Sequence, residues 1–314
     1  KWVNKKRPIL INNWEGTYFD FTEEKLLQMA EKAHQAGVEL FVLDDGWFGK
    51  RNNDTCSLGD WKVNYDKLPS GIDGLAEKIN KIGMKFGLWF EPEMISPDSD
   101  LYREHPDWAI HIDEREGVQS RNQMVLDLSR DEVCEYVINA VSDILANANI
   151  EYVKWDMNRQ LTDMPRLGYN HEYTLGYYKI MSAITEKFPN ILFEGCSAGG
   201  GRFDAGVLAY MPQIWTSDNS DAIARLKMQY STSMCYPVYS ISSHVTASPN
   251  HQCGRDTSLK TRADVAYCGT FGYELDVTKM SDEEFEEIKA QIKFEKRIQD
   301  LSLIHISEPT RRVV

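Results

Sequence analysis

Short apolar runs recur along this chain and alternate with longer stretches of helical periodicity. The runs are rich in β-branched and aromatic residues, and they do not alternate strictly with polar ones. This pattern is typical of strands that are buried on both faces of a parallel sheet. The expected strands cover residues 8–11, 40–43, 86–90, 152–155, 191–193 and 213–215, a run ending near residue 245, and residues 265–273.

Helix signals fill the intervals between these runs. The segments 129–132 and 281–284 each begin with Ser and end with Glu, a capping-box pattern ahead of an apolar helical stripe. Residues 23–36 predict another helix, which Gly37 ends. Strand and helix alternate about eight times, so the pattern predicts an α/β fold of the (β/α)8 TIM barrel type. An open doubly wound sheet is the alternative, but no early strand is followed by a GxGxxG or GxxxxGK[ST] loop.

Polar residues cluster where the expected strands end. In a barrel all these ends meet at one rim, where the active site lies. One polar strand end is unremarkable, whereas six of them indicate a shared binding site. They are the segments 12–14 (Asn-Asn-Trp), 44–47 (Asp-Asp-Gly-Trp), 91–93 (Glu-Pro-Glu), 154–156 (Lys-Trp-Asp), 194–196 (Glu-Gly-Cys) and 217–219 (Ser-Asp-Asn).

Two aspartates at these ends are candidates for acid chemistry. Asp156 is either a helix N-cap or a reactive carboxylate. Lys154 points to the same side of the strand, and its ammonium group would keep the carboxylate ionised. Asp218 ends another strand, and it would act as a proton donor if its surroundings are drier and less cationic than those of Asp156. Asp221 competes for that role, although it could instead cap the following helix.

The adjacent acids Asp44 and Asp45 can reach a common ligand from one strand end. Two carboxylates also suit a divalent metal, but no His accompanies them and neither HExxH nor EF-hand spacing is present. Arg121 is either a solvated surface residue or a ligand contact. Cys196 is either a buried small hydrophobe or a site residue, and it lacks a clear His base. The glycines at 199–201 indicate a backbone that approaches a ligand closely.

Composition and net charge narrow the classes of molecule that we expect this chain to bind. The net charge of −13 disfavours nucleic acid and anionic membranes, and no apolar run reaches the roughly 18 residues of a spanning helix. Eight Trp suit sugar stacking, although each can equally be a core residue. Six cysteines without a CxxC pair indicate reduced thiols, so we expect a cytoplasmic protein. The start without Met leads us to expect a piece of a longer protein.

Seven segments resemble glycoside hydrolase family 36, in family order and with similar spacing. The resemblance covers residues from about 5 to 301. The segments are 12–15 (NNWE), 42–48 (VLDDGWF), 87–94 (GLWFEPEM), 154–158 (KWDMN), 194–204 (EGCSAGGGRFD), 215–219 (WTSDN) and 244–251 (HVTASPNH).

The resemblance implies a retaining α-galactosidase that cleaves terminal α-linked galactose from sugars such as melibiose and raffinose. Asp156 would be the nucleophile and Asp218 the acid/base, with carboxyls roughly 5–5.5 Å apart. No cofactor or metal is implied, and the full-length enzyme would be a homo-oligomer. The remaining positions would bind galactose: Asp44 and Asp45 its hydroxyls, Trp14 as a wall, and Arg121, Lys154, Asn158, Cys196 and Gly199 as lining.

The expected organisation is a catalytic barrel over residues 1–301, without the β domains that flank it in the family. Residues 302–314 continue no periodic pattern, so we expect a non-native or disordered tail there. Three alternatives stay open. They are a galactosyl-transferring relative of the raffinose- or stachyose-synthase type, a metal-dependent barrel hydrolase using Asp44 and Asp45, and a catalytically impaired sugar-binding fragment.

Overall fold

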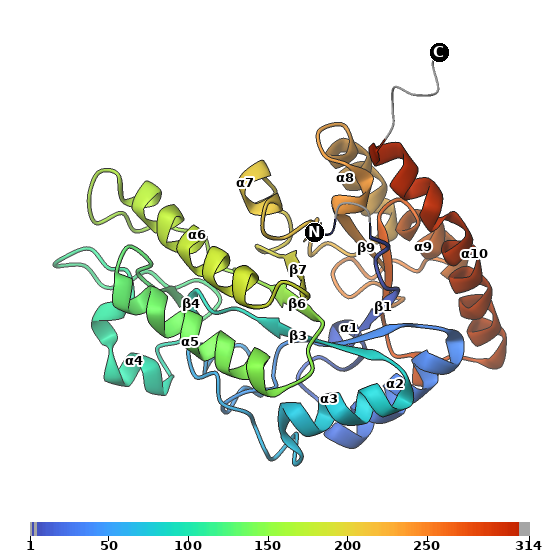
Figure 1. Cartoon of the computed structure of the whole chain (residues 1–314), viewed down its shortest axis with the longest axis horizontal. Coiled ribbons are helices and arrows are strands. Elements are labelled where there is room, and N and C mark those ends of the chain that lie inside the picture. Colours follow the sequence, from blue (N-terminus) through green and yellow to red (C-terminus); the bar gives the residue numbers. More distant parts are fainter. Residues whose placement is uncertain (1, 3–4, 308–314) are drawn as a thin grey trace.

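The chain folds into a closed barrel of eight parallel strands (Figure 1). The structure is a computed structural model that describes residue 2 and residues 5–307. Going around the barrel, the order is β1-β10-β9-β8-β7-β6-β3-β2. The closed barrel confirms the predicted TIM-barrel class. The strands are β1 (Leu10–Asn12), β2 (Leu40–Leu43), β3 (Lys85–Phe90), β6 (Tyr152–Trp155), β7 (Leu192–Gly195), β8 (Gln213–Trp215), β9 (Ile241–Thr246) and β10 (Thr270–Glu274).

Two apolar layers hold the barrel together. A small inner cluster fills the barrel with side chains from four strands: Leu10, Leu40, Val42, Tyr152 and Leu192. A much larger cluster lies between the strands and the surrounding helices. Because side chains alternate in direction along a strand, each strand supplies both layers, which explains its nearly continuous apolar sequence.

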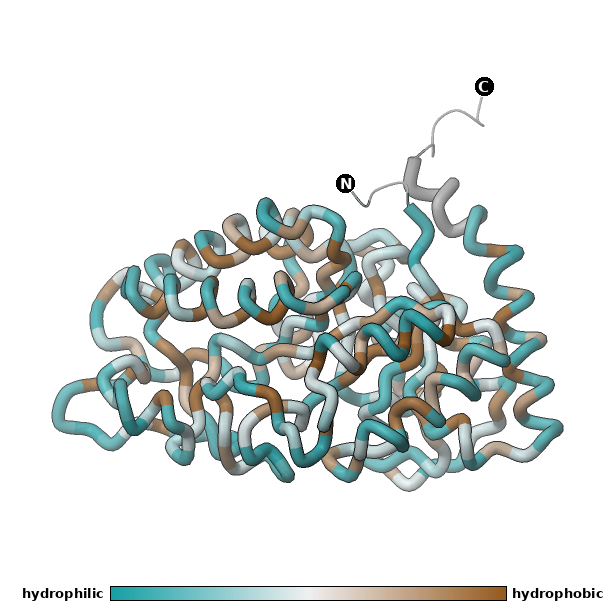
Figure 2. The backbone as a smooth tube through the Cα atoms, turned by 60° about the horizontal axis from the view of Figure 1, so that its bottom comes forward, coloured by the Kyte–Doolittle hydropathy of each residue, from teal (hydrophilic) through white to brown (hydrophobic). Residues whose placement is uncertain are grey.

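Helices surround the barrel, and their teal and brown stretches alternate as each helix turns one face to the strands (Figure 2). Neighbouring helices also pack against one another, and α5 against α6 and α2 against α3 are two extensive helix–helix interfaces (Figure 1). The longer helices are α2 (Glu23–Ala36), α3 (Gly71–Ile82), α5 (Asp131–Asn147), α6 (Tyr169–Lys187), α8 (Ala222–Ser233), α9 (Leu259–Ala266) and α10 (Asp282–Ser307). The short ones are α1 (Trp14–Thr17), α4 (Asp100–Glu104) and α7 (Ala205–Leu208), with single 3-10 turns at Pro106–Trp108, Val238–Ser240 and Val277–Lys279.

Two of the three predicted helix starts and ends are confirmed. The helix over 23–36 is α2, and Gly37 ends it in the left-handed region at φ 101°. The capping box at 281–284 is formed, because the Ser281 amide donates to the Glu284 carboxylate (3.0 Å) and the Glu284 amide donates to Ser281 Oγ (3.2 Å). It opens α10.

The capping box predicted at 129–132 is wrong. The Ser129 hydroxyl donates to Asp127 Oδ1 (2.6 Å), and Glu132 accepts from Arg130 (2.7 Å). Both side chains therefore have other partners, and α5 begins at Asp131 without a side-chain cap. Hydrogen bonds with Asp127 and Arg130 therefore replace the predicted capping box.

A two-stranded antiparallel sheet of β4 (Met94–Ile95) and β5 (Met124–Val125) interrupts the alternation between β3 and β6. The sequence pattern did not predict it, because each strand has only two residues. The strand expected over residues 265–273 begins only at Thr270, since Leu259–Ala266 is α9. These shifts leave the order of the barrel strands unchanged.

The expected boundary at residue 301 lies inside α10, which continues to Ser307. Residues 308–314 of the expected tail lie outside the described residues. Within the part of the chain that is described, no helix is long and apolar enough to cross a membrane. All six cysteines are free thiols.

Candidate active site

The polar strand ends meet at one cavity of about 350 Å³ at the carboxyl end of the barrel. Eight of the ten predicted site residues line it, and they come from strand ends and loops on different sides of the barrel. They are Trp14, Asp44, Asp45, Arg121, Lys154, Asp156, Asn158 and Asp218. The prediction that these residues share one site is therefore consistent with the geometry of the barrel rim.

Asp156 follows β6 directly and is almost completely buried, at 5% exposure. Its Oδ1 accepts from the Met157 amide (2.7 Å), and its Oδ2 accepts from Asn158 Nδ2 (2.7 Å) and Trp89 Nε1 (3.3 Å). These three donors fix the orientation of the carboxylate. No helix begins at Asp156, so the N-cap interpretation of this residue is wrong.

Lys154 lines the same cavity as Asp156, as strand periodicity predicts, but its ion pair is with another acid. Its Nζ lies 2.8 Å from Asp44 Oδ2, and both side chains are buried. The charges of Asp44 and Glu274 outweigh the effect of burial and raise the pKa of Lys154 well above its usual range. Asp156 is a weaker and more distant influence on Lys154. Lys154 thus supplies a fixed positive charge to the cavity floor.

Asp44 and Asp45 point to different partners although they are adjacent. Asp44 also accepts from Asn12 Nδ2 (2.6 Å), whereas Asp45 forms two 2.8 Å bonds with Arg51. Each acid therefore already has a buried cation beside it. Within the described residues no group of three or more His, Cys, Asp or Glu side chains is arranged to hold a metal ion. This pairing disfavours the metal-site interpretation.

Asp218 has the surroundings expected of a proton donor. Burial, followed by the negative charge of Asp156, raises its pKa to about 6, and the more distant Lys154 and Arg121 oppose the rise. Asp221 has a structural role instead, because its carboxylate caps α8 through the Ala224 amide (2.9 Å) and pairs with Arg255 (2.6 Å). The geometry thus favours Asp218 over Asp221.

Cys196 lies behind the cavity lining, between the two aspartates. Its thiol donates to Asp218 Oδ1 at 3.9 Å and lies within hydrogen-bonding reach of Asp156. Burial and both negative charges raise the pKa of the thiol well above its usual range. Cys196 is therefore a neutral donor to carboxylates, which is a poor state for a nucleophile.

Gly199 lies against the backbone that carries Asp218. Its φ of +88° is in the left-handed region, and a Cβ there would come 2.6 Å from Ser217 Cα and 2.9 Å from the Asp218 nitrogen. The expected close backbone approach is present, but it is made to the Asp218 segment. Neither Gly199 nor Cys196 lines the cavity surface.

Sequence reasoning missed seven cavity residues. Glu274 ends β10, and a strand-end carboxylate was a usable signal for it. Trp89 lies within an apolar strand, so its sequence position gave no sign that its indole nitrogen reaches Asp156. His251 and Gln252 come from a loop after β9, which periodicity cannot place. The full set is Glu15, Tyr18, Trp89, Trp215, His251, Gln252 and Glu274.

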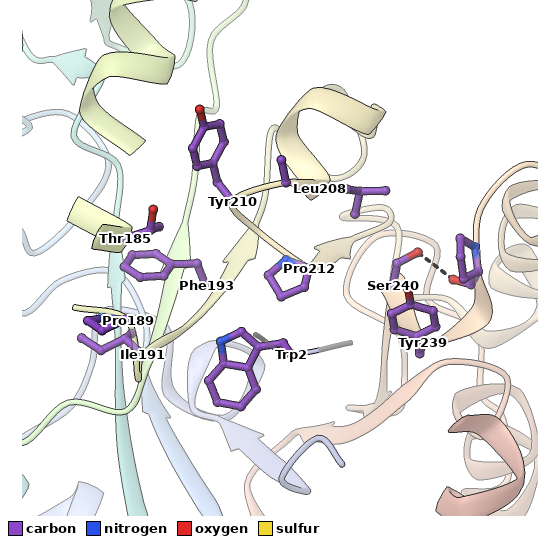
Figure 3. Close-up of a pocket in the computed structure, with 12 residues that line it drawn as sticks. Trp2, Thr185, Pro189, Ile191, Phe193, Leu208, Tyr210, Pro212, Tyr239 and Ser240 are labelled. Atoms are coloured by element: carbon purple, nitrogen blue, oxygen red, sulfur yellow. Dashed lines mark hydrogen bonds between the residues drawn. The ribbon is translucent and has the colours of Figure 1, made fainter. Parts of the chain in front are cut away.

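A second hollow, of about 250 Å³, lies near the amino ends of β7, β8 and β9, at the end of the barrel opposite the acidic cavity (Figure 3). Trp2, Phe193, Pro212 and Tyr239 surround it, and no Asp, Glu, Lys, Arg or His lines it. This hollow offers apolar contacts without acid or base groups, so it is not a candidate for the chemistry.

Comparison with known proteins identifies the family of the chain. The family described as Melibiase matches residues 1–305. The chain is 56% identical over 306 residues to the α-galactosidase AgaA of Geobacillus stearothermophilus, covering 95% of this chain and 42% of that protein. It is 51% identical to the α-galactosidase Mel36A of Lactobacillus acidophilus, covering 96% and 42%. The chain thus spans about two-fifths of the length of these relatives.

Solved structures give the same result. The crystal structure of the GH36 α-galactosidase AgaA superposes with a TM-score of 0.94 at 55% identity, covering 96% of this chain and 43% of that one. The galactosidase domain of the α-galactosidase–sucrose kinase AgaSK superposes with a TM-score of 0.95 at 51% identity, covering 96% and 42%. Variants of AgaA were crystallised with raffinose and with stachyose. The chain therefore belongs to the Melibiase family and is a relative of the family 36 α-galactosidases.

Proposed function

We propose that this chain is the catalytic barrel of a retaining α-galactosidase, which releases terminal α-linked galactose from oligosaccharides such as melibiose and raffinose. The observation that carries the proposal is the placement of two carboxyls in different surroundings around one cavity. Asp156 is oriented by three donors. The pKa of Asp218 is raised to about 6 by burial and by Asp156. A retaining glycosidase uses one oriented carboxylate as nucleophile and a second carboxyl that holds a proton as acid.

In the first step, an Asp156 oxygen attacks the anomeric carbon and forms a glycosyl ester. The bond from that carbon to the leaving oxygen breaks, and Asp218 transfers its proton to that oxygen. In the second step, Asp218 takes a proton from water while the water oxygen replaces Asp156 on the anomeric carbon. The two inversions together retain the configuration of galactose.

The electrostatic link between the two aspartates supports this division of roles. The negative charge of Asp156 is the second cause of the raised pKa of Asp218, after burial. Ester formation removes that charge, so the pKa of Asp218 falls in the intermediate. Asp218 is therefore favoured in its protonated form before the ester forms and in its deprotonated form afterwards, as the acid step and then the base step require.

The other cavity residues would bind galactose. Asp44, Asp45 and Lys154 lie on the cavity floor as charged partners for hydroxyl groups, and Trp14 forms an apolar wall. Arg121 and Asn158 lie near the acids. Cys196 and Gly199 would act from just behind the lining. The mechanism needs no cofactor or metal.

The proposal is tested by incubating the purified chain with melibiose and with an aryl α-galactoside, and by following the product in real time by proton NMR. We expect α-galactose to appear first, before it equilibrates to the β form. First appearance of the β-anomer would exclude the retaining mechanism. Turnover that disappears after exhaustive chelation would support the metal-dependent alternative instead.

Two further alternatives have distinct outcomes in the same assay. A galactosyl-transferring relative would form trisaccharide faster than free galactose when acceptor sugar is in excess. A catalytically impaired sugar-binding fragment would show galactose-induced stabilisation without turnover. Because the chain spans about two-fifths of its relatives, a longer version with flanking domains is the appropriate comparison.

We infer a cytoplasmic location from the free thiols of all six cysteines. We also propose that the full-length protein is a homo-oligomer, as the family resemblance implies. The net charge of −13 makes nucleic acid an unfavourable partner. Sedimentation analysis of a full-length form tests the oligomer.

A further inference from the structure

Glu15 is a buried carboxyl at the cavity that neither proposed chemical step uses. Its side chain is only 3% exposed. It lies on α1, directly after β1, and this short helix has little freedom to move. A Cβ on the neighbouring Gly16 would come within 3.1 Å of backbone atoms of Leu275 and Asp276, so α1 lies directly against the end of β10. Glu15 therefore projects from a fixed base.

The two Glu15 oxygens contact two loops that are far away in sequence. Oε1 accepts a short hydrogen bond from the Ser220 hydroxyl in the loop after β8. Oε2 accepts from the Ala247 amide after β9, at 3.1 Å. His251 Nδ1, further along the β9 loop, lies 3.3 Å from Oε1. One carboxyl thus joins the loops that follow three barrel strands.

The Ser220 end of this link lies two residues from Asp218. Asn250 Nδ2 donates to Ser220 Oγ (3.0 Å), and Gln252 Nε2 donates to the Asp218 carbonyl oxygen (2.8 Å). Thr246 Oγ1 donates to the Ser220 carbonyl oxygen (3.0 Å). The β8 and β9 loops are therefore bonded to each other, and Glu15 fastens both to α1.

The position is unfavourable for a carboxyl, which indicates a role other than stabilising the fold. Burial, and then the nearby charge of Glu274, raises the pKa of Glu15 to about 8. Among the ion pairs of the described residues, Glu15 has only His251, which is partly exposed. Placing one acid beside another in a buried site costs stability. We attribute the presence of Glu15 at this position to its three contacts with the loops after β8 and β9.

We propose that Glu15 is a positioning residue for Asp218: it fixes the β8 and β9 loops so that the Asp218 carboxyl meets the leaving oxygen of the substrate. This inference rests on the proposed α-galactosidase function, because it assigns Asp218 the acid role. Glu15 acts through Ser220 and Ala247. It therefore affects proton donation more than attack by Asp156.

Three variants separate this role from a purely structural one. Glu15→Ala removes both loop contacts. Glu15→Gln keeps one acceptor for the Ala247 amide and can donate to Ser220 Oγ. Ser220→Ala cuts only the link to the β8 loop. Ser281→Ala is the matched control, because it removes an exposed helix cap with no partner in the cavity. Each variant is assayed on melibiose, whose sugar alcohol leaves poorly, and on a nitrophenyl α-galactoside, whose phenol leaves easily.

We expect Glu15→Ala to lower kcat/KM for melibiose at least about 10-fold more than for the nitrophenyl substrate, since general acid catalysis contributes about 10²–10⁴-fold. Ser220→Ala should show the same bias to a smaller extent, and Glu15→Gln should recover part of the loss. Ser281→Ala should change both substrates equally. Equal losses on both substrates for Glu15→Ala and Ser220→Ala would overturn the proposal.

Hydrogen exchange provides a readout that does not depend on turnover. Glu15→Ala and Glu15→Gln should increase exchange in residues 217–221 and 247–252 together, with Glu15→Ala the larger effect, and with no increase across β6. Unchanged exchange in both segments contradicts the positioning role even if the chain is inactive. If the wild-type chain turns over neither substrate while the local exchange rises, the proposed function fails and the Glu15 link to both loops stands.

Discussion

Lys154 Nζ lies 2.8 Å from Asp44 Oδ2, so the buried cation of β6 is paired with the acid that follows β2, the strand on the other side of β3. Strand periodicity placed Lys154 on the same side as Asp156 but could not identify its partner. The pair bridges the end of β3 and puts a buried positive charge in the lining of the cavity. Asp156 relies on neutral donors from Trp89, Met157 and Asn158 instead.

The Lys154–Asp44 pair predicts a strong stability effect. Lys154→Met leaves the Asp44 carboxylate buried without its cation, and we expect the free energy of unfolding to fall by about 3 kcal/mol. Adding Asp44→Asn should recover part of that loss, as urea unfolding of the double variant will measure. Lys85→Met is the control, because its pair with Glu151 is half-exposed and should contribute less than about 1 kcal/mol. Additive effects of the two changes would show that the pair is not coupled.

The nucleophile assignment predicts near-complete loss of activity. Asp156→Ala removes the oxygen that attacks the anomeric carbon, so turnover of an aryl α-galactoside should fall by about 10³-fold or more. Thermal unfolding shows whether the variant is folded. Near-normal cleavage by Asp156→Ala would remove Asp156 from the mechanism.

The acid/base assignment predicts a loss that depends on the leaving group. Asp218→Ala should slow melibiose hydrolysis by about 10²–10⁴-fold and affect a nitrophenyl substrate much less in the first step. Added azide should accelerate the variant by attacking the ester intermediate. Asp221→Asn is the matched control, because it perturbs the cap of α8 in the same loop and should not show the bias. The assignment to Asp218 is wrong if that bias appears in Asp221→Asn alone.

The raised pKa of Asp218 predicts how kcat/KM falls on the alkaline side of its pH profile. Asp218 must be protonated to act as acid, and its pKa is raised to about 6. We therefore expect kcat/KM for melibiose to decline as pH rises through about 6. Asp156→Asn removes one cause of the shift, so the pKa of Asp218 in that variant should be lower when measured by carboxyl carbon NMR. An unchanged or higher pKa there would contradict the electrostatic link.

The raised pKa of Glu91 predicts that the free energy of unfolding depends on pH, apart from any effect on catalysis. Burial and the charge of Asp156 raise its pKa from the usual 4.5 to about 8. Its stabilising contribution is complete below pH 4.5, where both folded and unfolded states hold the proton, and it is lost as pH rises toward 8. Glu91→Gln can still accept from Gln123 and Asn158, so its unfolding free energy should depend less on pH across this window. Chemical denaturation at pH 5 and pH 8 tests this, and equal slopes for the two proteins would argue against it.

The barrel was predictable because each strand is buried on both faces and ends in polar residues. That pattern identifies the strands and the rim, and it brought eight of the predicted residues to one cavity. The family resemblance favoured Asp218 over Asp221, and the structure adds a physical reason, because Asp221 accepts from the Ala224 amide and pairs with Arg255. Both follow the same strand, so local sequence could not rank them physically.

The contacts that the sequence could not predict include several between segments that lie far apart along the chain. Glu15 meets Ser220 and Ala247 more than 200 positions away. No periodicity encodes such pairs. The two-stranded sheet between β3 and β6 could not be predicted, because strands of two residues carry no alternation. The capping box at 129–132 failed for a local reason, since the Ser129 hydroxyl donates to Asp127, two residues away.

The two ends of the barrel differ in a way that matters for engineering. The hollow near the amino ends of β7, β8 and β9 has no acid or base in its lining, and about 250 Å³ of its space is unfilled. Larger apolar side chains at positions such as Leu208 could raise thermal tolerance there without altering the charges at the opposite rim. The apolar hollow is thus a place where stability can be changed apart from the carboxyls at the opposite rim.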